Sequence, residues 1–123
     1  MLVDALGNPR RFRLTSGAAG DNPQAIPLLE GWQAQEVVAD RGDDADRTLA
    51  SIEGTMGAAA TIPPKTSRAV PRACDDAAYK ERHLAECLIG QRKRFRRIAT
   101  RYDKDARRSL AFVHLASTLL WLQ

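Results

Sequence analysis

The sequence contains few of the residues that stabilise secreted or membrane-spanning proteins. Its two cysteines, Cys74 and Cys87, are thirteen positions apart and belong to no CxxC or Cys/His ligand pattern. A disulfide framework or a structural zinc site is therefore not expected, and both residues are predicted to be reduced thiols. The chain also lacks a run of about 18 apolar residues and the basic and apolar regions of a signal peptide. We expect a cytoplasmic protein with no membrane partner.

The residues that are present are those of an ordinary soluble domain. Hydrophobic residues make up 44% and charged residues 28% of 123 positions, which indicates one globular domain. The net charge of +4 conceals an uneven distribution, because Lys65 to Arg108 holds fourteen basic and six acidic residues, and the rest holds five basic and nine acidic. A basic segment of this kind is typical of proteins that bind a polyanion, most often nucleic acid.

Turn residues and apolar periodicity predict an α/β protein with a mixed sheet flanked by helices. Asn22 is expected to cap the first helix, with Pro23 at its first position. The expected elements are a hairpin over 1–16, a helix over 23–31, a strand over 36–40, a helix over 45–54, a strand over 58–62, a basic loop over 63–75, a long helix over 76–101 and a C-terminal helix over 104–122.

Asp40 follows the apolar run EVVA at the end of a predicted strand. Ligand-binding groups in open α/β sheets favour the carboxyl ends of strands, so Asp40 is a candidate site residue. The alternative is that Asp40 only caps the next helix.

The long predicted helix carries a narrow polar stripe. At about 100° per residue, Tyr79, Arg82, Glu86 and Lys93 fall on one side of this helix, nearly opposite its apolar face. The stripe is either a functional surface or a solvated face, on which Arg82 and Glu86 would form a pair worth about 0.2–0.5 kcal/mol.

The spacing of this stripe, Tyr-x2-Arg-x3-Glu-x6-Lys, resembles the Tyr-Arg-Glu-Lys signature of the DDE transposases of bacterial insertion sequences. Further blocks that resemble the same family, in the same order, are VDALGNP (3–9), VVADRGDDAD (37–46), RFRRIATRYDK (94–104) and LAFVHLASTLLWL (110–122). The resemblance covers essentially the whole chain.

The resemblance implies a ribonuclease H-like fold in which two Asp and one Glu hold two Mg²⁺ or Mn²⁺ ions that cut and join DNA. Asp40 matches the second Asp and Glu86 the Glu, so both are expected to be catalytic metal ligands. Tyr79, Arg82 and Lys93 match positions that hold the DNA end. Further basic residues extend a possible DNA-binding track, or else form a solvent-facing surface: Arg92, Arg94, Arg96, Arg97 and Arg101.

The chain also departs from the family pattern. The first catalytic Asp and the first, central strand belong upstream of the hairpin, so a partial ribonuclease H-like fold is expected. Asp43 stands at a position where the family has an aromatic residue, and Gly90 interrupts the signature helix. We therefore expect a transposase fragment that is inactive alone, binds metal poorly and is marginally stable or prone to aggregate.

The family resemblance also implies which partners to expect. The expected partners are DNA at the ends of an insertion sequence and the missing N-terminal half or a full-length transposase. A second hypothesis is a non-catalytic DNA-binding or regulatory protein that inhibits active transposase, and a third is a basic α/β domain of unrelated function.

Overall fold

The computed structural model describes residues 1–16, 18–95, 98 and 105–122. The chain forms two compact units, which we call the hairpin unit (Met1–Leu14 with His83–Gln123) and the parallel-sheet unit (Thr15–Arg82). The sequence indicated a single domain. It gave no sign of the boundary at residue 82, because that residue falls inside a continuous helical pattern and has no linker composition around it. Helices and strands occur in both units, which confirms the α/β class.

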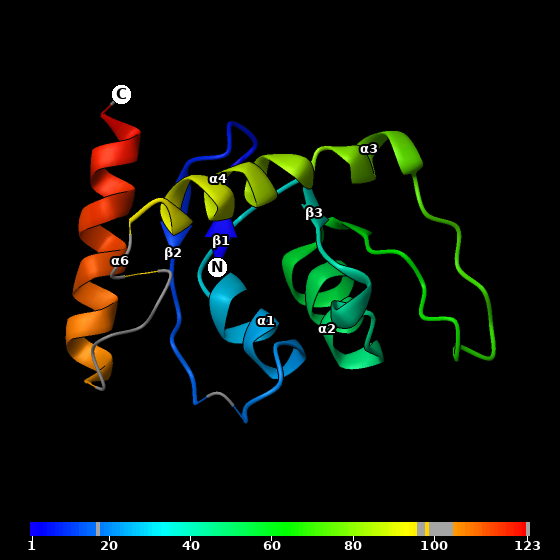
Figure 1. Ribbon diagram of the computed structural model, residues 1–123. Helices are drawn as coiled ribbons and strands as arrows, with labels where there is room; N and C mark the ends of the chain where they lie inside the picture. The colour runs from blue at the N-terminus through cyan, green and yellow to red at the C-terminus, as the bar shows by residue number, and fades with distance from the viewer. Residues whose placement is uncertain (17, 96–97, 99–104, 123) are drawn as a thin grey trace. The chain divides into compact units, whose positions relative to one another are not determined.

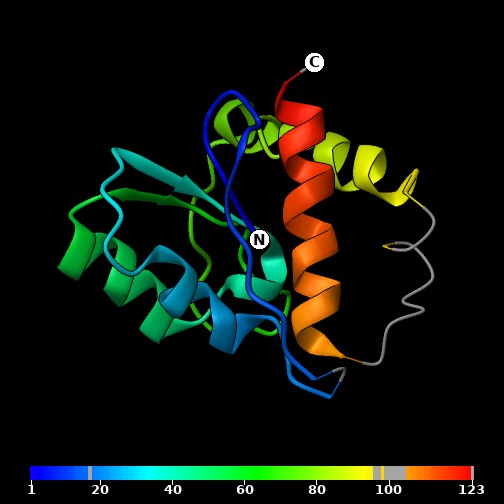
Figure 2. The same ribbon diagram turned by 90° about the vertical axis from the view of Figure 1, so that its left-hand side faces the viewer.

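The parallel-sheet unit is built around two strands that run in the same direction. Its elements are α1 (Asn22–Leu29), β3 (Glu36–Val38), the 3₁₀ turn η1 (Arg41–Asp43), α2 (Asp46–Ala50), the π-helix η2 (Ser51–Met56), β4 (Ala59–Thr61) and α3 (Asp76–Lys80). β3 and β4 pair in parallel, and α2 with η2 forms the helical crossover that such a pair requires. Figures 1 and 2 show α1 and α2 on the same side of the two strands.

The core of this unit lies between the crossover helix and β4. Ile52 and Ile62 are almost fully buried there, together with Thr48. η2 ends at Gly57, whose φ of +69° is a conformation that glycine adopts without strain. The amide of Ala58 then donates to the Ile52 carbonyl at 3.0 Å, which directs the chain into β4.

The hairpin unit joins the first residues of the chain to its last helices. β1 (Leu2–Val3) and β2 (Pro9–Arg11) pair antiparallel, and α4 (His83–Lys93) contacts α6 (Ala106–Trp121). Asp105 caps α6, because its carboxylate accepts a hydrogen bond from the Arg107 amide at 2.9 Å. Leu88 and Ala116 are buried within this unit.

The long helix expected over residues 76–101 is interrupted. α3 ends at Lys80 and α4 begins at His83. Between them the amides of Glu81 and Arg82 donate to carbonyls three residues back, at 3.0 and 3.1 Å, so the last turn tightens instead of continuing as an α-helix. A second turn at residues 94–95 follows α4.

Three further expectations differ in detail. Asp21, not Asn22, occupies the cap position of α1, and the Asn22 side chain donates to the Gly42 carbonyl at 3.2 Å. The helix expected over 45–54 continues as a π-helix to Met56. The described strands form one antiparallel and one parallel pair instead of one mixed sheet. Among the helices of the described ranges, none has the length and apolar character needed to cross a membrane.

Candidate functional site

Asp40 lies directly beyond the carboxyl end of β3, as the sequence predicted. One carboxylate oxygen accepts a hydrogen bond from the Arg41 amide at 2.6 Å, and the Asp40 carbonyl accepts from the Asp43 amide at 2.8 Å. Asp40 therefore caps η1, which was the alternative interpretation of this residue. Its side chain is still 62% exposed, and the second oxygen points to a different neighbour.

That neighbour is Arg82, which belongs to the proposed signature. Its guanidinium lies 3.6 Å from the Asp40 Oδ2 atom and 5.3 Å from the centre of the Tyr79 ring. Because both side chains of the ion pair are partly exposed, the pair contributes at most about 1 kcal/mol. The structure thus brings together three candidate residues from two segments of the parallel-sheet unit that are far apart in the sequence.

Asp43 adds negative charge to the same turn. Burial raises its pKa above the ordinary 3.8, and the nearby carboxylates of Asp40 and Asp21 raise it further. An aromatic residue, which the family resemblance places at this position, would carry no such charge. The repulsion between the Asp43 carboxylate and those of Asp40 and Asp21 is therefore a feature of this chain that the family pattern does not contain.

The other two members of the signature lie in the hairpin unit. Glu86 and Lys93 are both exposed on α4, seven residues apart and so on nearly the same helix face. Gly90 lies between them on that face, and a Cβ atom added there would meet no other atom within 4 Å. The boundary between the two units falls between Arg82 and His83, so Asp40 and Glu86 belong to different units.

Two arginines of the predicted DNA-binding track differ in their surroundings. The guanidinium of Arg92 lies over the Phe12 ring at 4.8 Å, and His114 contacts the same ring edge-on at 5.3 Å. The Arg92 Nε is buried with no hydrogen-bond partner in the described part of the chain, and burial lowers the pKa of this group. Arg94 is exposed. The remaining candidates, Arg96, Arg97 and Arg101, lie outside the described residues.

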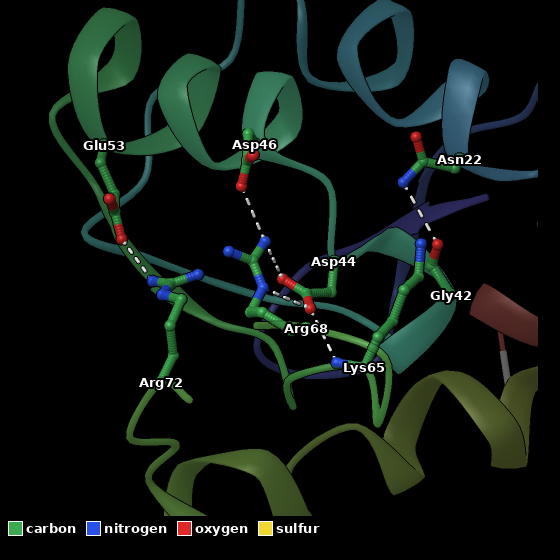
Figure 3. A network of polar contacts seen from close by, with 8 residues as sticks. All are labelled: Asn22, Gly42, Asp44, Asp46, Glu53, Lys65, Arg68 and Arg72. Atoms are coloured by element: carbon green, nitrogen blue, oxygen red, sulfur yellow. Dashed lines mark hydrogen bonds and ion pairs between the residues drawn. The ribbon is translucent and has the colours of Figure 1, made fainter. Parts of the chain in front are cut away.

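The structure also contains a polar cluster that sequence reasoning missed (Figure 3). The buried carboxylate of Asp44 accepts hydrogen bonds from Arg68 Nε at 2.9 Å, from Arg68 Nη2 at 2.8 Å and from the Lys65 amide at 2.7 Å. These bonds, led by those from Arg68, lower the pKa of Asp44. Asp46 accepts a further bond from Arg68 at 2.9 Å. We call Asp44, Lys65 and Arg68 the loop clamp.

The loop clamp fixes part of the basic loop to the acidic turn that follows Asp40. A second bond, from Arg72 to Glu53 at 2.8 Å, ties the same loop to η2. An open pocket of about 390 Å³ lies beside the clamp, lined by residues 44–46, Lys65 and 67–70. No local spacing could have revealed this cluster, because Asp44 and Arg68 are 24 positions apart.

The charges also divide unevenly between the two units. The hairpin unit contains twelve basic and four acidic residues, a balance of +8. The parallel-sheet unit contains seven basic and eleven acidic residues, a balance of −4. Asp40 is thus in the acidic unit, whereas Glu86, Lys93 and Arg94 are in the basic one.

The carboxylates present are the correct donor type for Mg²⁺ or Mn²⁺, which favour oxygen ligands. However, the described residues bring together no group of three or more Asp, Glu, His or Cys side chains that would hold a metal ion. The described residues of this chain therefore do not form a complete metal centre.

Comparison with known proteins identifies the family. Over 123 residues, which are 99% of this chain and 95% of the relative, the sequence is 42% identical to a protein of Brucella ovis named "Putative transposase for insertion sequence element IS6501". No protein-family profile matches the chain, and no solved structure matches it. The identity and its extent across both proteins show that this chain belongs to the insertion-sequence transposases.

Proposed function

We propose that the chain supplies part of a DDE transposase active site, in a ribonuclease H-like fold, which cuts and joins the DNA ends of an insertion sequence. The observation that carries this proposal is the ion pair of Arg82 with Asp40 beyond the carboxyl end of β3, with the Tyr79 ring against the same Arg82 guanidinium. A generic solvated helix face would not require a signature residue to contact the residue that matches the second catalytic Asp.

The proposed roles follow the chemistry of the side chains. Asp40 and Glu86 are the metal ligands, since hard cations such as Mg²⁺ or Mn²⁺ bind carboxylate oxygen. Arg82 and Lys93 bind phosphate oxygens, and Tyr79 stacks on the DNA end. When bound, the metal ions would polarise water and stabilise the leaving oxygen.

The protein is proposed to be inactive alone. Two carboxylates without the first Asp bind metal weakly and position the scissile phosphate poorly. The first Asp would be supplied by the N-terminal half of the site or by a full-length transposase. Because Asp40 and Arg82 form a partly exposed ion pair, a phosphate would compete with Asp40 for Arg82, and a metal ion would compete with Arg82 for Asp40.

The test is a nicking assay on supercoiled DNA that carries the ends of the insertion sequence, with Mg²⁺ or Mn²⁺. The chain alone should not cut, whereas a mixture with a polypeptide that contains the first Asp should. Asp40→Asn and Glu86→Gln should each abolish cutting by the mixture, and Arg94→Ala should only weaken it.

A different result would favour the second candidate, a non-catalytic DNA-binding protein, which the +8 balance of the hairpin unit supports. In that case the mixture would not cut, and salt-sensitive DNA binding by the chain would be unaffected by Glu86→Gln. Inhibition of a full-length transposase by the added chain would then identify a regulatory role.

A further inference from the structure

The tip of the β1–β2 hairpin is held rigid by a single carboxylate. Asp4 Oδ1 accepts from the amides of Leu6 and Asn8, both at 2.9 Å, and Oδ2 accepts from Arg10 Nε at 2.9 Å. Two backbone bonds close the same turn, from the Gly7 amide to the Asp4 carbonyl at 2.9 Å and from the Asp4 amide to the Asn8 carbonyl at 3.0 Å. Such a network fixes residues 5–7 in one conformation.

This rigid tip presents a large apolar side chain to solvent. Leu6 is 82% exposed, the highest value among the large hydrophobic residues of the described ranges. An isolated exposed leucine is ordinary on a flexible loop. Here the backbone on both sides of Leu6 is hydrogen-bonded, so the side chain projects from a fixed support.

The tip also lies against the helix that carries Glu86. Gly7 has a φ of +81°, and a Cβ atom added to it would be 3.4 Å from the Leu84 Cβ. Leu84 is in the first turn of α4, two residues before Glu86. Figures 1 and 2 both show the blue hairpin loop beside the start of α4. Leu6 therefore projects next to the first turn of the signature helix.

The hairpin unit, which carries Leu6, suits a polyanion because it contains twelve basic and four acidic residues. DNA-binding proteins that distort a duplex combine such positive charge with an apolar side chain inserted between base pairs, which unstacks them.

We propose that Leu6 is a wedge that inserts into DNA at the transposon end and unstacks the bases next to the bond positioned for cutting. This inference rests on the proposed function, because it requires the hairpin unit to bind DNA. Its physical logic is that unstacking two bases costs a few kcal/mol, which an inserted apolar side chain offsets by replacing part of the lost stacking.

The test uses the full chain and duplexes of the transposon end that contain 2-aminopurine, whose fluorescence rises when it is unstacked. Binding of the parent chain should raise the fluorescence at one or two adjacent positions. Leu6→Ala should remove that rise and weaken binding roughly tenfold, the value expected for losing a buried leucine side chain. A mismatch at the same step should restore most of the affinity, because the bases there are already unstacked.

Leu122→Ala is the matched control, since Leu122 is 77% exposed and lies at the end of α6. It should behave like the parent chain, and circular dichroism should show both variants folded. If Leu6→Ala binds and unstacks like the parent while Arg94→Ala loses affinity, the wedge is wrong and the proposed DNA-binding function stands. If the parent chain does not bind these duplexes, both proposals are overturned.

Discussion

The loop clamp gives the sharpest prediction for stability, because one arginine contacts two carboxylates of opposite exposure. The Asp44 side chain is 0% exposed and that of Asp46 is 90% exposed, yet both accept a hydrogen bond from Arg68. Substitution of each carboxylate by its amide keeps the shape and removes the charge. Because both carboxylates bond the same Arg68, a difference in unfolding free energy between the two variants reports the difference in burial.

Asp44→Asn should lower the free energy of unfolding by about 1.5–3 kcal/mol, the cost of a lost hydrogen bond to a charged group in a buried site. Asp46→Asn should cost less than about 1 kcal/mol, as is usual for an exposed ion pair. Urea unfolding followed by circular dichroism measures both values. The two units could unfold separately, so the transition should also be followed by tryptophan fluorescence in a Trp121→Phe background, which leaves Trp32 of the parallel-sheet unit as the reporter.

The same variants have a predicted pH dependence. Since the pKa of Asp44 is lowered in the folded state, its contribution is complete above the ordinary pKa of 3.8 and is lost as the pH falls through the folded pKa. The difference between the parent chain and Asp44→Asn should therefore shrink in acid. Equal costs for Asp44→Asn and Asp46→Asn at pH 7, or a difference that does not depend on pH, would refute the assignment of a buried clamp.

Three further predictions concern other described residues. Gly90→Ala should stabilise the chain by about 1 kcal/mol in urea unfolding, because the added Cβ meets no atom and alanine favours the helix, whereas Gly7→Ala should destabilise it by about 1–2 kcal/mol because of its positive φ. Arg92→Ala should lower the unfolding free energy by about 1–2 kcal/mol through loss of the contact with an aromatic ring, whereas Arg94→Ala should weaken DNA binding in a filter assay with unchanged stability. Because the pKa of Asp43 is raised above 3.8 in the folded state, the ionised carboxylate destabilises the fold and the protonated one does not. Asp43→Asn should therefore stabilise the chain at pH 7 and have little effect below pH 3.8. The same sign of effect in the two glycine variants, matching behaviour of the two arginine variants, or a benefit of Asp43→Asn that persists in acid would contradict these expectations.

Local patterns predicted part of the local structure. The position of Asp40 after β3 follows from an apolar run bounded by an acidic residue. The predicted cap of the first helix was wrong, because Asp21 and not Asn22 holds that position. The tightened turn at Glu81 and Arg82 was not predicted, because the residues around it all favour a helix. Such an interruption depends on tertiary packing, which a periodic pattern does not contain.

The candidate site was predictable only through spacing and family resemblance. Neither periodicity nor charge could place Arg82 beside Asp40, since contacts across 42 positions depend on how the chain folds back. The same limit applies to Arg92, which the sequence grouped with Arg94 as one basic track. The ring that Arg92 contacts, Phe12, is eighty positions away in the sequence, so no local pattern could predict that Arg92 is partly buried.

The pairing of Arg68 and Arg72 with carboxylates has a consequence for how tightly the protein holds DNA at different salt concentrations. Each phosphate contact made by a solvated cation releases condensed counterions from the duplex, and the number released sets how steeply affinity falls as salt rises. Arginines that already neutralise Asp44 and Glu53 would only exchange one anion for another. The slope of log affinity against log salt should therefore not include these two arginines.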